Sequence, residues 1–185
     1  MKNISLQKFK YLEVVFIVVL ASALAFVFIQ NTHESVAKDR DALRISDINK
    51  IRFALGQYKT DHGMYPPCLY QKDSCQSLEG STAMPVVPKD PLTGLGYTYS
   101  GLGSGASCTS FHVGASLERT GSQALLTGSD APPQASTTFC TGSAPDFSGL
   151  SYSPGGQPCN ALVGRAQPTP EENGETCYDL KPRSQ

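Results

Sequence analysis

The feature that most constrains this chain is an apolar run near its N-terminus. Residues 14–29 carry no charge, and extending the run back to Tyr11 adds a single acid, Glu13. A helix rises about 1.5 Å per residue, so this run approaches the roughly 30 Å hydrocarbon thickness of a bilayer. The sequence therefore predicts a transmembrane helix over residues 11–30, which places the residues before it and after it on opposite sides of a membrane.

Basic residues before the run predict its orientation. Lys2, Lys8 and Lys10 precede it, and no acid appears before Glu13. By the positive-inside tendency, residues 1–10 form a cytoplasmic leader and the C-terminal part is extracytoplasmic. A cleaved secretory signal is disfavoured, because its apolar region is usually about 7–15 residues long and ends at a small-residue site. An uncleaved anchor and an anchor that also assembles with other helices both stay open.

Glu13 distinguishes these two alternatives. A carboxylate costs on the order of 3 kcal/mol at the bilayer centre and less near its edge. Glu13 is therefore either an interfacial charge that stays solvated or pairs with Lys10, or a contact for a positive group within an assembly.

The helix is expected to continue beyond the membrane to about Thr60. Its end is indicated by Gly63 and the Pro66-Pro67 pair. Apolar residues recur every three or four positions and predict one buried helix face: Ala42, Ile45, Ile48, Ile51, Leu55 and Tyr58. The charged residues between them are expected on the other faces: Lys38, Arg40, Asp41, Arg44, Asp47 and Lys50.

The following segment predicts a small sheet. Residues 61–92 are rich in turn signals, and residues 95–99 and 110–117 show the aromatic or β-branched alternation of strands. The glycine-rich residues 101–107 indicate a hairpin connection. The fold class is thus α+β: a long N-terminal helix packed on a small antiparallel sheet. Residues 31–119 form this head, and residues 120–185 form a loop-rich C-terminal extension.

Six cysteines follow the anchor, where an oxidising compartment lets disulfides persist. Six cysteines allow 15 pairings, and the sequence favours three bridges. They are Cys68–Cys75, Cys108–Cys140 and Cys159–Cys177. Zinc is disfavoured, because no two cysteines have the close spacing of a zinc site.

The net charge and the sequence motifs disfavour several classes of function. The net charge of −1, from 15 basic and 16 acidic residues, predicts no nucleic-acid partner. No catalytic or phosphate-binding motif is present, and His33, His62 and His112 are scattered, so we expect no enzyme and no cofactor.

Two stretches resemble the type IV pilin and type II secretion pseudopilin superfamily, especially its major-pseudopilin branch. Residues 44–66 read RISDINKIRFALGQYKTDHGMYP, and residues 87–100 read VPKDPLTGLGYTYS. With the strand after them, these stretches cover roughly half the chain in matching order and spacing. The resemblance implies a pilin-like head and a membrane helix that packs with other pilin-like subunits. It also implies a calcium site as a less favoured expectation, since calcium prefers several oxygen ligands. The candidate ligands are Asp130, Asp146, Glu171, Glu172 and Asp179.

The resemblance also extends in part to the leader. Phe9-Lys10-Tyr11-Leu12-Glu13 keeps the Phe and the Glu of the family motif, whereas Lys8 stands where the family has Gly. It implies cleavage between Lys8 and Phe9, and it implies that Glu13 engages the new N-terminal amine of a neighbouring subunit.

We therefore expect a structural subunit of a type IV pilus or a type II secretion-like assembly. The alternative is an uncleaved, single-pass, extracytoplasmic binding module that does not polymerise. An anchored enzyme is disfavoured.

Overall fold

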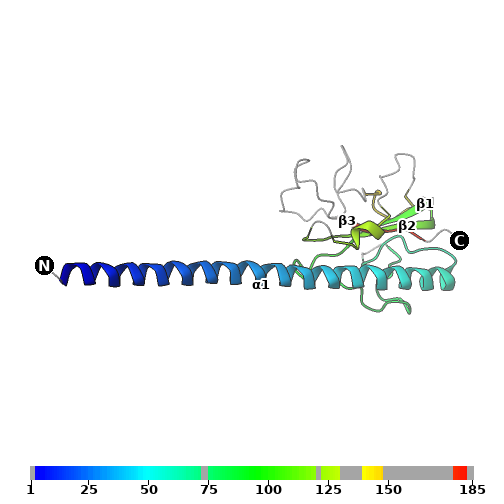
Figure 1. Ribbon diagram of the computed structural model, residues 1–185. Coiled ribbons are helices and arrows are strands. Elements are labelled where there is room, and N and C mark those ends of the chain that lie inside the picture. Colours follow the sequence, from blue (N-terminus) through cyan, green and yellow to red (C-terminus); the bar gives the residue numbers. More distant parts are fainter. Residues whose placement is uncertain (1–2, 72–74, 120–121, 130–138, 148–176, 183–185) are drawn as a thin grey trace. The chain divides into compact units, whose positions relative to one another are not determined.

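The computed structural model describes residues 3–71, 75–119, 122–129, 139–147 and 177–182, with only the backbone described for residues 3–10, 30, 31 and 33. One long helix is followed by a small antiparallel sheet, which confirms the α+β class (Figure 1). The chain divides into two compact units, Met1–Asp39 and Arg40–Gln185. The first consists of helix, and the second holds the rest of the helix together with all the strands.

Helix α1 runs without interruption over Asn3–His62. Its C-terminal end lies close to the predicted one. Gly63 follows with a φ of 77°, a left-handed conformation that glycine adopts without steric cost, and its N–H donates to the Lys59 carbonyl at 2.8 Å.

The buried face of α1 in the second unit differs in part from the predicted one. Ile48 and Ile51 are fully buried, but Ala42 is exposed. Successive helix residues are rotated by about 100°, so Ala42 lies on the side of the helix opposite Ile51. The predicted stripe used mostly spacings of three residues, and each such step turns it further away from a single face. The buried positions alternate in steps of three and four: Asp41, Arg44, Ile48, Ile51, Leu55 and Tyr58. Two charged residues thus occupy positions that were predicted to be exposed.

The sheet has the order β1-β2-β3, and both neighbouring pairs are antiparallel. Strand β1 spans Thr98–Ser104 and β2 spans Ser107–Ser116, so the turn between them consists of residues 105 and 106 alone. The prediction that residues 101–107 form the connection is therefore wrong for most of that run. A short 3-10 helix, η1 (Leu125–Thr127), follows β2.

Two of these glycines are needed because other atoms come close to them. A side chain at Gly101 would meet the Cys140 sulfur at 3.0 Å. At Gly103, where the register between β1 and β2 shifts, it would lie 1.9 Å from the Ser107 carbonyl oxygen. The glycines therefore allow neighbouring atoms to approach the backbone closely within the strand pair. The glycine-rich composition of the same residues had predicted a loop.

Strand β3 (Cys177–Leu180) lies within the extension that was predicted to be loop-rich. It pairs with the end of β2, and all four of its residues are buried. Tyr178 and Leu180 belong to the main core, whereas Cys177 packs with Phe147. The sheet therefore has partners on both faces.

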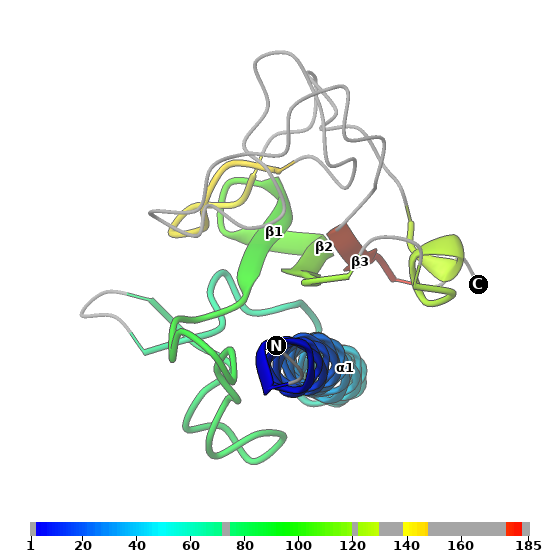
Figure 2. The same cartoon turned by 60° about the vertical axis from the view of Figure 1, so that its left-hand side comes forward.

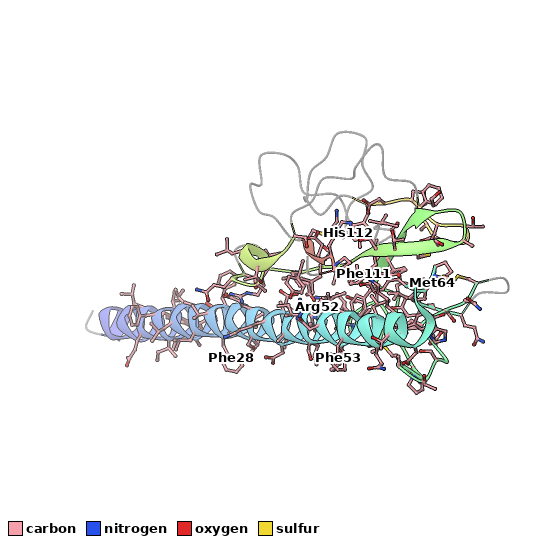
Figure 3. All side chains as sticks on the ribbon, turned by 90° about the vertical axis from the view of Figure 1, so that its right-hand side faces the viewer. Phe28, Arg52, Phe53, Met64, Phe111 and His112 are labelled. Carbon is pink, nitrogen blue, oxygen red and sulfur yellow. A yellow bond between two sulfur atoms is a disulfide. The ribbon has the colours of Figure 1, made fainter. Side chains whose placement is uncertain are left out.

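The core lies between α1 and the sheet. Figure 2 shows the strands and the segment between α1 and β1 flanking the helix on different sides. In Figure 3, Phe111 lies on the helix side of the sheet, His112 lies on the other face, and Phe53 points from α1 away from the sheet. Phe111 is 2% exposed and Phe53 is 79% exposed.

This contrast gives a matched pair of variants. We expect Phe111→Ala to lower the free energy of unfolding by about 3–5 kcal/mol, because it leaves a cavity in the core. Phe53→Ala should change it by less than about 0.5 kcal/mol. Urea unfolding of the full-length protein in detergent, followed by tyrosine circular dichroism, measures both, and equal effects would contradict this placement of the core.

Candidate functional site

The first unit presents a continuous apolar surface along α1. The large apolar side chains of residues 11–29 are all exposed, from 52% at Leu20 to 73% at Leu12. Exposed apolar surface of this extent marks a membrane or protein contact. Within the part of the chain that the structure describes, α1 is the one helix long and apolar enough to cross a membrane.

The predicted assembly and processing residues lie at the start of this helix. Glu13 is exposed within the apolar surface. Lys8 and Phe9 also belong to α1, but only their backbone is described. Phe9 and Glu13 are four residues apart, so they share one side of the helix. Cleavage before Phe9 and the role of Glu13 stay predictions.

The second unit contains a buried ion cluster centred on Arg44, whose side chain is 1% exposed. Nη1 of Arg44 donates to Asp41 Oδ1 at 2.9 Å and to Glu118 Oε1 at 2.6 Å. Nε of Arg44 donates to Asp90 Oδ2 at 2.6 Å. Arg40 donates to Glu118 as well. One guanidinium therefore bonds three carboxylates from three separate parts of the chain.

Asp41 connects the helix to the end of β2. It lies one turn before Arg44 on α1, which brings both side chains to the same face. Its Oδ1 accepts the backbone N–H of Glu118 at 2.8 Å, and its Oδ2 accepts that of Arg119 at 3.1 Å. The side chain thus satisfies two backbone donors just beyond the strand, which fixes Glu118 beside Arg44.

Asp90 is held by a tight turn of its own. Its Oδ1 accepts the backbone N–H groups of Leu92 at 3.0 Å and of Thr93 at 2.9 Å. The Asp90 carbonyl accepts the N–H of Gly94, which has a φ of 68°. The Asp-Pro-x-x-Gly sequence therefore folds into a loop that positions one carboxylate against Arg44.

The ionised forms of this cluster stabilise one another. Burial opposes ionisation of Asp90, but hydrogen bonds from Arg44 and from the Thr93 N–H outweigh it and lower its pKa to about 2. The pKa of Glu118 is lowered, chiefly by its hydrogen bond with Arg40. Burial likewise disfavours charged Arg44, yet its carboxylate partners leave its pKa raised. The cluster is therefore charged at neutral pH and connects α1 to two other parts of the chain.

A second buried cluster surrounds His112 on the other face of the sheet. Nδ1 of His112 lies 2.8 Å from Asp146 Oδ1, and Nε2 lies 2.6 Å from Asp179 Oδ2. The ring stacks on Phe147, with centroids 3.8 Å apart. Burial opposes ionisation of Asp146, but its hydrogen bond with His112 lowers the pKa of the carboxyl. Because His112 has no exposed surface and both its nitrogens are occupied, it connects structural elements and is closed to a substrate.

The calcium candidates are only partly described. Asp146 and Asp179 lie on opposite nitrogens of His112, which separates them as ligands. Asp130, Glu171 and Glu172 lie outside the described residues. Within the described ranges, no group of three or more His, Cys, Asp or Glu side chains could hold a metal ion.

Two of the predicted disulfides are confirmed. Cys68 bonds Cys75 within the segment after α1, and Cys108 of β2 bonds Cys140. Cys177 is also disulfide-bonded, but Cys159 lies outside the described residues, so the third pairing stays a prediction.

Comparisons with protein-family models, with curated proteins and with solved structures find no match for this chain. Its function must therefore be argued from its own residues.

We expect Arg44→Gln to lower the free energy of unfolding by about 3–5 kcal/mol, because the buried carboxylates of Asp41 and Asp90 lose their cation while Glu118 keeps Arg40. Lys50→Gln is the matched control, since Lys50 is 60% exposed and pairs with Asp47 on its own helix. It should cost no more than about 1 kcal/mol. Urea unfolding at neutral pH measures both, and similar costs would contradict a central role for Arg44.

Acid should weaken the contribution of this cluster to stability. The pKa of Asp90 is lowered on folding from 3.8 to about 2, so its stabilisation is fully present above pH 3.8 and is lost as the pH falls through about 2. In Arg44→Gln, Asp90 loses the cation that lowers its pKa and takes up a proton at higher pH. The difference in unfolding free energy between wild type and Arg44→Gln should therefore shrink as the pH falls toward 2. A difference that stays constant from neutral pH would refute this coupling.

Proposed function

We propose that this chain is a membrane-anchored, pilin-like or pseudopilin structural subunit of a type IV pilus or a type II secretion-like assembly. The observation that carries the proposal is α1 itself. One helix presents an exposed apolar surface over residues 11–29 and contributes Ile48 and Ile51 to the core of an α+β unit. A subunit that joins a head to a membrane-embedded bundle of helices needs both properties in one element.

The head supports this proposal through the residues that carry the resemblance. The first stretch, residues 44–66, holds the end of α1 with its core face and the turn after His62, and residues 87–100 supply the Asp90 turn and the start of β1. The two stretches meet through Arg44 and Asp90. The segments that resemble the superfamily are thus joined by the buried contact on which the helix and the head depend.

We place the N-terminus in the cytoplasm and the head outside it. Three lysines precede the apolar run and favour this orientation. The bridges Cys68–Cys75 and Cys108–Cys140 suit an oxidising, extracytoplasmic compartment.

Glu13 is the residue through which we propose that subunits assemble. An exposed carboxylate within an apolar helix surface is costly in lipid unless it meets a cation. Cleavage between Lys8 and Phe9 would create an amine at Phe9, one helical turn from Glu13. A neighbouring subunit's amine of this kind is the positive partner that the carboxylate requires.

A second candidate function is favoured by Lys8. Because a lysine stands where the superfamily has glycine, a processing peptidase could leave the chain intact. The protein would then be a single-pass, extracytoplasmic binding module with a pilin-like head that does not polymerise.

A crosslinking experiment tests the proposal. A photocrosslinking amino acid replaces Leu20, which is 52% exposed on the apolar surface, in membranes of the producing cell. We expect crosslinks to other pilin-like subunits that Glu13→Gln reduces by at least about tenfold, as expected for the loss of a charge-assisted contact. Glu34→Gln is the control, since it makes the same change beyond the apolar run, and it should leave the crosslinks intact.

The intact mass of the same protein identifies which candidate function holds. Loss of residues 1–8 with crosslinks that depend on Glu13 supports the structural subunit. A full-length mass, with crosslinks absent or insensitive to Glu13→Gln, would overturn it in favour of the non-polymerising module.

A further inference from the structure

A hollow of about 500 Å³ lies in the second unit between the helix, the segment after η1 and the edge strand β3. Its walls come from parts of the chain far apart in sequence: Asn49, Arg52, Thr127, Ser129, Tyr178, Leu180, Lys181 and Pro182. Figure 3 places Arg52 on the sheet-facing side of α1. Neither the membrane surface of residues 11–29 nor the Arg44 cluster contributes a residue to it.

The charge of this hollow is one-sided. Arg52 and Lys181 are both partly buried in its wall, and no carboxylate is among the lining residues. Arg40 and Arg44, by contrast, bond carboxylates directly. Among the described residues, no acid pairs with Arg52. A half-buried guanidinium left without an anion is an incomplete arrangement, because its donors are partly removed from water.

The neighbouring polar groups are fixed in place and add hydrogen-bonding capacity. Ser129 donates its backbone N–H to the Asp179 carbonyl at 2.9 Å, and its Oγ accepts the Lys181 N–H at 3.1 Å. The Ser129 hydroxyl proton is therefore still available for a ligand. Nδ2 of Asn49 donates to the Tyr178 hydroxyl at 3.1 Å, which connects α1 to β3 within the wall of the hollow.

We propose that this hollow binds an oxyanion, a carboxylate or a phosphate group carried by a small ligand. Arg52 supplies the planar fork that pairs with two oxygens at once, and Lys181 supplies a second positive charge. The Ser129 hydroxyl donates a further hydrogen bond. The site lies wholly within the second unit and does not depend on whether the chain polymerises. Either a free anion or a lipid head group could deliver this chemistry.

Binding is tested on the full-length, isotopically labelled protein in a non-ionic detergent at constant ionic strength. The probes are sodium phosphate, sodium citrate and glycerol 3-phosphate, with sodium chloride as the reference. Saturable shifts of the Thr127 and Ser129 amide resonances are expected with at least one probe. Preference for glycerol 3-phosphate over phosphate indicates a lipid head group as the source, and the reverse indicates a free anion.

Charge-neutralising variants distinguish binding in this hollow from non-specific electrostatic attraction to the protein surface. Arg52→Gln and Lys181→Gln should each weaken binding by at least about tenfold, the loss expected when one charged donor is removed. Lys89→Gln is the control, because it removes an exposed lysine outside the hollow, and it should bind like wild type. If Arg52→Gln perturbs folding, Lys181→Gln alone decides. The absence of saturable shifts with all three probes, or equal weakening by Lys89→Gln, would overturn the proposal.

Discussion

The Arg44 guanidinium is the interaction on which the arrangement of the second unit depends. It bonds Asp41 on its own helix, Asp90 in the turn before β1 and Glu118 just after β2. A purely apolar contact could hold these segments at several registers, because burial of apolar surface is not directional. One planar guanidinium can hydrogen-bond all three carboxylates only when the segments that carry them take up one specific arrangement. Breaking such a buried set is costly, which makes the position of the helix against the head a specific one.

The second face of the sheet is organised by another polar group. His112 projects from β2 and bonds Asp146 on one side and Asp179 of β3 on the other. The helix-facing side of the sheet is by contrast filled with apolar residues such as Phe111 and Val113. Apolar packing therefore covers the helix-facing side of the sheet, and the hydrogen bonds of the His112 imidazole organise the other side. This explains how β3 is buried throughout and how β2 is buried from Phe111 to Ala115.

Local sequence patterns predicted the parts of the fold that depend on local physics. The continuation of α1 to its end near Gly63, the hairpin and the Cys68–Cys75 bridge all follow from neighbouring residues, whereas the predicted Cys108–Cys140 bridge joins cysteines 32 positions apart. Arg44 was assigned to the surface because charge was weighed above spacing. The alternating steps of three and four from Asp41 through Ile51 were the signal that could have corrected this. Strand β3 could not be predicted in the same way, because four residues with a central Asp179 form a strand only through partners distant in sequence.

The position of β3 has a consequence for the order in which the molecule can fold. Tyr178 and Leu180 complete the core against α1, and the Tyr178 hydroxyl bonds Asn49, a residue 129 positions earlier. Helix α1 emerges from the ribosome well before β3, the strand that covers its face. Contacts this distant along the chain form slowly, and partly formed cores expose apolar surface in the meantime. The helix face around Ile48 therefore stays incompletely covered until β3 has emerged, so the finished fold depends on a strand that is synthesised long after the helix it covers.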